Sequence, residues 1–179
     1  MEFEIVNFFN QLAAGWIDPA TIFVSSNTLL GILGIIITGY FLIWDKKNGK
    51  QIAVAAVIAV GLHFLTSEIF FKYILPEFGL FRLRPYLAHP GELIPLGKLN
   101  TSSSFPSSHM AYILSLSTVY VYYYRKFLLP AAAFALFMAF ARIHNGMHYP
   151  SDVLAGAVLG VLYGIMAIKI SKKYAKKDI

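Results

Sequence analysis

Two histidines, His109 and His148, stand beside basic and carboxylate residues in short polar segments of an otherwise apolar chain. Arg84 precedes a proline in one segment, and the segment 142–152 ends on Asp152. Arginine offers phosphate oxygens a planar fork of hydrogen-bond donors. Histidine can act as a nucleophile or as a proton donor to a leaving oxygen. Together these residue types are the ones that a phosphoryl-transfer site requires.

The residues around each histidine favour that chemistry. Pro106 suits the first turn of a helix, so the backbone amides of the next three residues should point outward at a positive helix end, which binds anions. Asp152 follows His148 by four residues. Its carboxylate could therefore hold one ring nitrogen of His148 and fix the tautomer.

The elements that position these residues are expected to lie in a lipid bilayer. The chain has 179 residues, of which 58% are hydrophobic and 13% are charged, whereas roughly 25% are charged in a typical soluble domain. A soluble protein of this size has too little interior to bury so much apolar surface. The chain contains no cysteine, which excludes disulfides and thiolate metal sites.

Five long apolar runs predict an all-α fold, an integral membrane bundle of five transmembrane helices. The uncharged run 21–44 alone is long enough to cross about 30 Å of hydrocarbon at about 1.5 Å per residue. Residues 1–18 are expected to form an amphipathic N-terminal helix in the membrane interface, or else a short helix that caps the bundle. The whole chain, 1–179, is predicted to be one domain. The spans are predicted near residues 21–44, 52–71, 106–124, 127–143 and 152–170, with an outer loop at 72–105.

Lysines and arginines are divided unequally between the two sides of this bundle, and loops rich in them stay in the cytoplasm. One side carries ten of them and the other five. This predicts an outer amino terminus, an inner carboxyl terminus and a multi-pass protein of the cytoplasmic (inner) membrane. The net charge of +6 therefore reflects topology, and no nucleic-acid partner is expected. The five basic residues on the outer side are Lys72, Arg82, Arg84, Lys98 and Arg142.

The polar segments resemble the signature motifs of the type 2 phosphatidic acid phosphatases, the PAP2 superfamily. Arg142, His148 and Asp152 are similar to the third motif, Arg-x5-His-x3-Asp, with Ala141 in place of its leading serine. Residues 106–109, Pro-Ser-Ser-His, are similar to the second motif, Pro-Ser-Gly-His.

The first motif, Lys-x6-Arg-Pro, is matched only at its end, by Arg84 and Pro85. Its lysine would fall on Glu77, and the nearest upstream lysine is Lys72. Two residues are therefore candidates for the role of the motif's lysine. A longer turn could return Lys72 to the site, or Arg82 could take its place.

The resemblance implies a covalent mechanism without a metal or cofactor. His148 would attack phosphorus, Asp152 would orient His148, and His109 would protonate the departing lipid oxygen and then activate water. Vanadate should inhibit such a site. The phosphate oxygens would be held by Lys72, Arg84, Ser107, the amide of Ser108, and Arg142.

The expected function is a lipid phosphatase whose site faces the periplasm or the cell exterior, with lipid A 1-phosphate favoured as substrate. Phosphatidylglycerophosphate and undecaprenyl diphosphate are alternative substrates, and a lipid phosphotransferase is an alternative reaction. An anion transporter is the alternative outside enzymes, although the spans are nearly free of charge below the outer rim. The expected partners are the lipid substrate and membrane lipids, and the sequence predicts no oligomeric state.

Three other histidines, His63, His89 and His144, are interpreted as structural. Glu68 is a functional candidate because ionisable residues within membrane spans are rare and usually have a function. Two pairings are predicted for it, with His63 or with a lysine of the site.

Overall fold

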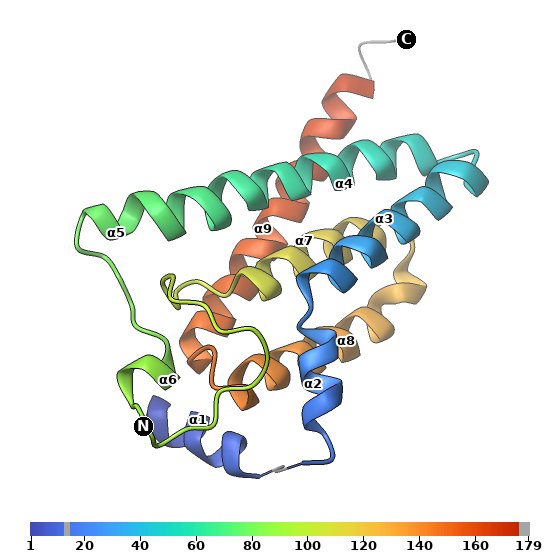
Figure 1. Ribbon diagram of the computed structural model, residues 1–179. Helices are drawn as coiled ribbons and strands as arrows, with labels where there is room; N and C mark the ends of the chain where they lie inside the picture. The colour runs from blue at the N-terminus through green and yellow to red at the C-terminus, as the bar shows by residue number, and fades with distance from the viewer. Residues whose placement is uncertain (13–14, 176–179) are drawn as a thin grey trace.

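The computed structural model describes residues 1–12 and 15–175, and every element in them is helical (Figure 1). The amino terminus, α1 and α6 lie at one end of the molecule, and α9 runs from that end to the opposite one. The elements are α1 (Glu2–Gln11), α2 (Asp18–Val24), α3 (Asn27–Trp44), α4 (Gly49–His63), a π-helix η1 (Phe64–Ile74), α5 (Leu75–Glu77), α6 (Pro85–Ala88), α7 (Ser108–Tyr123), a 3-10 turn η2 (Arg125–Phe127), α8 (Leu128–His144) and α9 (Pro150–Ala175).

The all-helical prediction is confirmed for the described residues, and four helices are long and apolar enough to cross a membrane. They are Asn27–Trp44, Gly49–Glu77, Arg125–His144 and Pro150–Lys173. The remaining predicted span corresponds to α7, which has 16 residues. Its crossing of the bilayer stays a prediction, as does the count of five spans.

The first predicted span, 21–44, is divided into two helices. The backbone leaves the helical conformation at Ser25 and Ser26, and the Ser26 hydroxyl accepts a hydrogen bond from Leu29 N (3.4 Å), which caps the start of α3. Serine is a strong N-cap residue because its side chain satisfies an otherwise unpaired amide. The helix that crosses the bundle here therefore begins at Asn27, and α2 is a separate short helix.

The second predicted span, 52–71, is longer than expected. α4, η1 and α5 follow one another without a break as far as Glu77 (Figure 1). Lys72 therefore lies in a helix, and the outer connection starts near Gly79, whose φ of 75° favours glycine. A lysine after an apolar run predicted the end of a span. Here the Lys72 ammonium instead pairs with Glu68 one turn earlier (2.5 Å), as residues four apart on a helix can do.

The helices α7 and α9 approach each other closely along a stripe of glycines. A Cβ atom at Gly156 would lie 2.3 Å from the Ser107 carbonyl oxygen, and one at Gly160 would lie 2.6 Å from that of Ala111. A Cβ atom at Gly164 would lie 2.5 Å from Thr118. The small residues every four positions thus mark a helix contact within the bundle, and this contact places Ser107 beside the first turns of α9.

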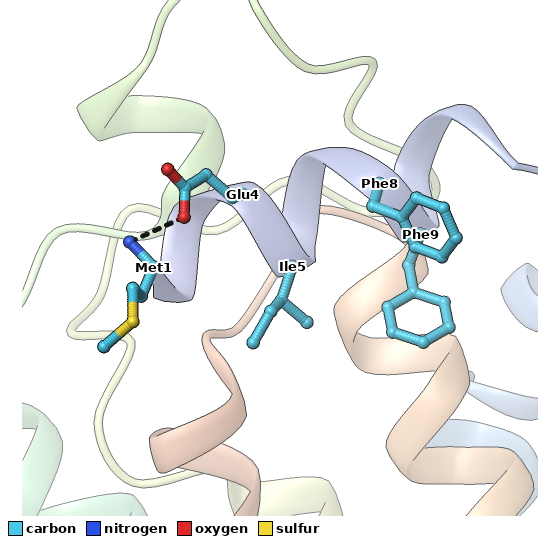
Figure 2. Close-up of a pocket in the computed structure, with 5 residues that line it drawn as sticks. All are labelled: Met1, Glu4, Ile5, Phe8 and Phe9. Carbon is cyan, nitrogen blue, oxygen red and sulfur yellow. Dashed lines mark ion pairs between the residues drawn. The ribbon is translucent and has the colours of Figure 1, made fainter.

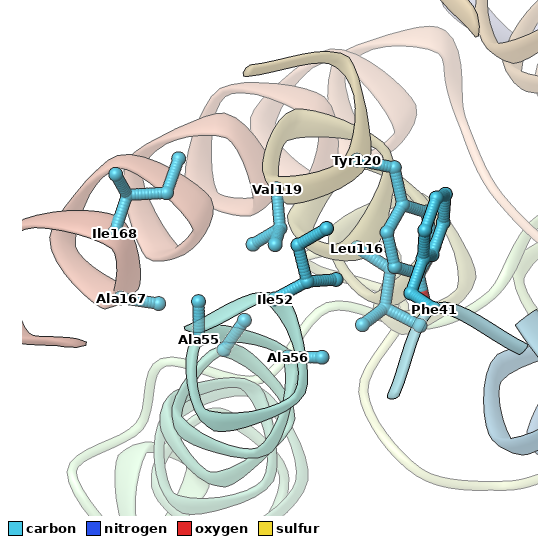
Figure 3. Packing of buried hydrophobic residues seen from close by; sticks show 10 residues of the cluster. Phe41, Ile52, Ala55, Ala56, Leu116, Val119, Tyr120, Ala167 and Ile168 are labelled. Carbon is cyan, nitrogen blue, oxygen red and sulfur yellow. The ribbon is translucent and has the colours of Figure 1, made fainter. Parts of the chain in front are cut away.

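The core between α3, α4, α7 and α9 is filled by small and branched side chains together with the rings of Phe41 and Tyr120 (Figure 3). Ile52 and Val119 are fully buried, and Ala55 and Ala167 allow the helices to approach. A second cluster, which includes Met110 and Met138, joins α7 to α8. The bundle thereby fixes the start of α7, the end of α8 and the start of α9 relative to one another.

The amino-terminal helix α1 covers the end of the bundle at which α6 lies. Val6 is fully buried, and the buried Asn10 amide donates to the carbonyl oxygens of Ile94 (2.9 Å) and His144 (2.7 Å). Ile5 and Phe8 are 42% and 59% exposed, and Figure 2 shows them on one side of the helix with Met1 and Phe9. The helix thus caps the bundle and also presents an apolar face, while its placement in the membrane interface stays a prediction.

Candidate active site

His148 is 2% exposed and lies in the connection between α8 and α9. Its Nδ1 lies 2.8 Å from the carbonyl oxygen of Ser104. A carbonyl oxygen only accepts hydrogen bonds, so Nδ1 carries the proton and Nε2 keeps its lone pair. Nε2 lies 3.4 Å from Nη1 of Arg84, so the free nitrogen of the ring faces a guanidinium.

Burial lowers the pKa of His148, and the guanidinium groups of Arg142 and Arg84 lower it further. The carboxylate of Asp152 opposes this effect by favouring the charged ring. The net direction is downward, so the imidazole is neutral at pH 7. A neutral imidazole is the form that can attack an electrophile.

Asp152 is fully buried, and both oxygens of its carboxylate accept hydrogen bonds. Oδ2 accepts from the Ser104 hydroxyl (2.5 Å) and from Tyr149 N (2.8 Å), and Oδ1 accepts from Arg82 Nη1 (2.7 Å). His148 Nδ1 is 3.8 Å from Oδ2, which is longer than a hydrogen bond. Asp152 therefore reaches His148 through Ser104, whose hydroxyl binds the carboxylate and whose carbonyl binds the ring.

Arg84 is held by backbone carbonyl groups. Its Nε donates to Ser102 O (3.0 Å), Nη1 to Met147 O (3.1 Å) and Nη2 to Ser103 O (3.2 Å). Carbonyl groups orient the guanidinium without neutralising its charge. The side chain is 4% exposed, so a full positive charge is fixed beside His148.

Arg142 and Ser107 each have a buried polar atom without a hydrogen-bond partner in the described part of the chain. These atoms are Arg142 Nε and Ser107 Oγ. A buried donor without a partner is destabilising, and a buried charge more so. Four side-chain atoms of this kind occur in the described residues, the others being His63 Nδ1 and Asn145 Oδ1. The two at residues predicted to hold phosphate indicate a site whose missing partner is an anion.

Lys72 lies on the Ser108 side of the site. Glu68 accepts from its ammonium with one carboxylate oxygen and from the Ser108 hydroxyl with the other. His63 Nε2 lies 3.9 Å from the same carboxylate. The pairing of Glu68 with a lysine of the site is therefore present and brings Lys72 to the first turn of α7, whereas the distance to His63 is longer than a hydrogen bond.

Arg82, the other candidate for the lysine of the first motif, lies on the Asp152 side. Its guanidinium binds Asp152 and also Glu2 (2.6 Å). The two candidates thus occupy opposite sides of the site, with Lys72 beside the predicted phosphate amides and Arg82 behind the carboxylate.

His109 is half-buried in the first turn of α7, and its Nε2 lies 2.9 Å from the carbonyl oxygen of Ser25. This carbonyl becomes available because the helix is interrupted between α2 and α3. Nε2 carries a proton in this contact, so Nδ1 is the nitrogen left free for another partner.

His144 is separate from this group. It is fully buried, its Nδ1 lies 2.8 Å from Phe9 O, and its Nε2 lies 2.8 Å from Asp18 Oδ1. It ties α8 to the amino-terminal segment, as the structural interpretation of this residue predicts.

The sequence did not indicate roles for Ser104 or Glu2, and for Arg82 it indicated a phosphate contact, not the contact with Asp152. Ser104 precedes the second motif by two residues, which is the only signal it offers. Arg82 and Glu2 are 70 and 150 residues from Asp152 along the chain, and only the folded bundle brings them together.

Comparison with known proteins agrees with this geometry. Residues 51–176 match the model of the PAP2 superfamily, and this range includes the three motifs. The chain therefore belongs to the PAP2 superfamily and is a phosphoric ester hydrolase of that type.

Several relatives cover most of the chain. It is 26% identical over 177 residues to undecaprenyl-diphosphatase BcrC of Bacillus subtilis, which is 96% of this chain and 84% of that protein. It is 28% identical over 178 residues, 97% of this chain and 82% of that protein, to bacitracin transport permease protein BcrC of Bacillus licheniformis. A lipid A 1-phosphatase of Rhizobium johnstonii is 24% identical over 90 residues, 50% of this chain and 33% of that protein.

The fold is that of a solved membrane phosphatase. The transmembrane PAP2 type phosphatidylglycerolphosphate phosphatase from Bacillus subtilis superposes with a TM-score of 0.69 at 19% identity, covering 96% of this chain and 85% of that chain.

Proposed function

We propose that this protein removes phosphate from a membrane lipid through a phosphohistidine on His148. The observation that carries the proposal is the pair of unpartnered buried atoms at Arg142 and Ser107, close in the fold to a buried, neutral imidazole. A phosphate group would satisfy both atoms, and its phosphorus would then face His148 Nε2.

In the first step, Nε2 of His148 forms a bond to phosphorus, and the bond from phosphorus to the lipid oxygen breaks. His109 enters this step as the imidazolium, with a second proton on Nδ1, and gives that proton to the lipid oxygen while Nε2 keeps its contact with the Ser25 carbonyl. In the second step, water loses a proton to His109 and attacks phosphorus, the bond to Nε2 breaks, and inorganic phosphate leaves. The two steps together return His148 and His109 to their starting states.

The basic residues stabilise the charge that develops on the phosphate oxygens. We assign this role to Arg84, Arg142 and Ser107, with the Ser108 amide and Lys72 at the start of α7. Lys72 would exchange its contact with Glu68 for a phosphate oxygen. Asp152 supports the imidazolium that forms when His148 is phosphorylated.

We propose undecaprenyl diphosphate as the first substrate to test. The undecaprenyl-diphosphatase of Bacillus subtilis matches almost the whole chain, whereas the lipid A 1-phosphatase matches half of it. Lipid A 1-phosphate, which the sequence favoured, and phosphatidylglycerophosphate are the alternatives. The division of basic residues between the two sides supports a site at the outer leaflet of the cytoplasmic membrane.

The test is release of inorganic phosphate from the three lipids by the purified protein in detergent with excess chelator. We expect turnover of at least one lipid by the wild type and a loss of roughly 10⁴-fold or more in His148→Ala. Turnover retained by His148→Ala, or turnover that requires a divalent metal, would overturn the mechanism.

Two further arms separate the alternatives. A phosphotransferase would transfer labelled phosphate to an added lipid alcohol instead of to water. A transporter would move anions across sealed vesicles without releasing phosphate from any lipid, and His148→Ala would not abolish this movement.

A further inference from the structure

Arg82 connects the amino-terminal helix to the buried carboxylate of the site. Its Nη1 donates to Asp152 Oδ1 (2.7 Å) and to the Ser151 hydroxyl (2.6 Å), and its Nη2 donates to Glu2 Oε2 (2.6 Å). The guanidinium also lies 4.2 Å from the centre of the Tyr149 ring. One side chain therefore joins the start of α1 to the start of α9.

Glu2 is fixed at this point by a second contact. Its other oxygen, Oε1, accepts from the backbone amide of Ser151 (3.0 Å) in the first turn of α9. Burial raises the pKa of Glu2, but the hydrogen bonds from Ser151 and Arg82 outweigh this effect and lower it overall. Glu2 is thus ionised at pH 7 and balances the charge of Arg82.

Arg82 also contacts the second group that orients His148. Its carbonyl oxygen accepts from Ser104 N (2.8 Å), and the Ser104 carbonyl accepts from His148 Nδ1 (2.8 Å). The Arg82 side chain therefore fixes Asp152 while its backbone fixes Ser104, and these two residues surround Nδ1 of the proposed nucleophile.

We propose that Glu2 and Arg82 are positioning residues of the active site, and that α1 contributes to catalysis by holding Asp152 and Ser104 in the arrangement that orients His148. This inference rests on the proposed phosphatase function. The charge of Glu2 matters in this arrangement because Arg82 otherwise attracts the Asp152 carboxylate without competition. Asp152 would then be less available to the imidazolium that forms during phosphoryl transfer.

The test compares single variants by steady-state kinetics on the lipid that the wild type hydrolyses. Arg82→Gln should lower kcat about 10- to 100-fold, the range found when a partner that orients a reactive ligand is removed. Glu2→Gln should lower kcat about 3- to 10-fold, within the range of coupling between contacting residues. KM should change less than twofold in both variants, because neither residue touches the phosphate donors Arg84 and Arg142.

Glu4→Gln is the matched control. Glu4 is on the same helix, its side chain is 76% exposed, and its ion-pair partner is the amino group of Met1 (2.9 Å). This variant removes the same charge from α1 and should keep wild-type kcat. Arg82→Lys should recover part of the loss seen in Arg82→Gln, and Glu2→Gln combined with Arg82→Gln should be no slower than Arg82→Gln alone.

The outcomes separate this inference from the proposed function. If the wild type is active and His148→Ala is inactive, but Glu2→Gln and Arg82→Gln both keep wild-type kcat, the positioning role is wrong. It is also wrong if kcat falls only in proportion to the folded fraction measured by thermal unfolding. If the wild type and Glu4→Gln release no phosphate from any lipid, the proposed function itself is wrong.

Discussion

The two sides of the His148 ring differ in how completely their polar atoms are partnered. On the Asp152 side, both carboxylate oxygens accept hydrogen bonds, from Ser104, Tyr149 and Arg82. The residues proposed to hold phosphate form the other side, where Arg142 Nε is buried without a partner in the described residues, although Arg84 beside Nε2 is held by three carbonyl groups. The saturated side orients the ring, and the unsaturated side is prepared for an anion that arrives with the substrate. Substitutions on the two sides should therefore change stability in opposite directions.

The largest effect is expected from Asp152→Asn on the saturated side. An amide group cannot accept from all the donors that now surround the carboxylate, and the charge of Arg82 loses its buried partner. We expect kcat to fall about 10³- to 10⁴-fold and the free energy of unfolding to fall by about 3 kcal/mol or more. Kinetics and thermal unfolding in detergent measure the two effects.

Asp45→Asn is the control for that variant. Asp45 accepts hydrogen bonds from Tyr124 and from the amides of Lys47 and Asn48 at the other end of the bundle. The Asp45→Asn variant should be less stable than the wild type and should keep the wild-type kcat. A kcat of Asp152→Asn above a tenth of the wild-type value would contradict the role of the carboxylate.

Arg142→Met tests the unsaturated side. We expect kcat/KM to fall about 10²- to 10³-fold, as when a donor to the transition-state charge is removed. The apo protein should nevertheless become more stable, by about 2–4 °C for each kcal/mol gained, because an unpaired buried charge is removed. Thermal unfolding with and without vanadate measures this, and vanadate should stabilise the wild type more than the variant.

Arg125→Met, at an exposed position in the connection between α7 and α8, should change neither the apo stability nor kcat/KM. If Arg142→Met destabilised the apo protein, Arg142 would have a partner, and the contrast between the two sides would fail.

Ser107→Ala should have a smaller effect of the same kind. Loss of one neutral hydrogen bond to phosphate corresponds to about 0.5–1.5 kcal/mol, so kcat/KM should fall roughly 2- to 10-fold. The apo protein should become slightly more stable, because an unpartnered buried hydroxyl is removed. Ser171→Ala, which removes a buried hydroxyl that donates to Ile168 O (3.0 Å), should not alter kinetics. An unchanged vanadate affinity in Ser107→Ala would remove this hydroxyl from the site.

The smallest expected effect concerns pH and stability. Because the pKa of His148 is lowered by burial and by Arg142 and Arg84, the unfolded chain binds a proton near pH 6.5 that the folded chain does not. The free energy of unfolding should therefore fall as pH decreases below about 6.5, by at most about 1.4 kcal/mol per pH unit. His148→Ala should show a weaker decrease between pH 7 and pH 5 in thermal unfolding, and an equal decrease would contradict a neutral buried His148.

The catalytic side of the site could be predicted because its residues lie close together in the chain. Arg142, His148 and Asp152 are within eleven residues, and His109 lies in the first turn of α7, which begins at Ser108, two residues after the Pro106 that predicted a helix start here. The long helices could be predicted for the same reason, because a membrane span is recognised from one continuous run of apolar residues.

The supporting contacts could not be predicted because they join distant segments. Nothing near Glu2 indicates that it will meet Arg82, and the direct hydrogen bond expected between Asp152 and His148 is replaced by contacts through Ser104. The sequence also did not predict that the second span extends past Lys72. Composition alone places the end of the helix at this charged residue, but the ion pair with Glu68 allows Lys72 to remain in the helix.

The close contact of α7 with α9 at Gly156 has a consequence for how this enzyme could diversify. The Ser107 carbonyl lies where any larger side chain would have to be, so α7 and α9 cannot slide past each other, and the groups on both helices keep one register. The outward surfaces of α3 and α4 carry no such constraint. Substitutions there would leave this register unchanged, and with it the relative placement of the groups at the ends of α7 and α9.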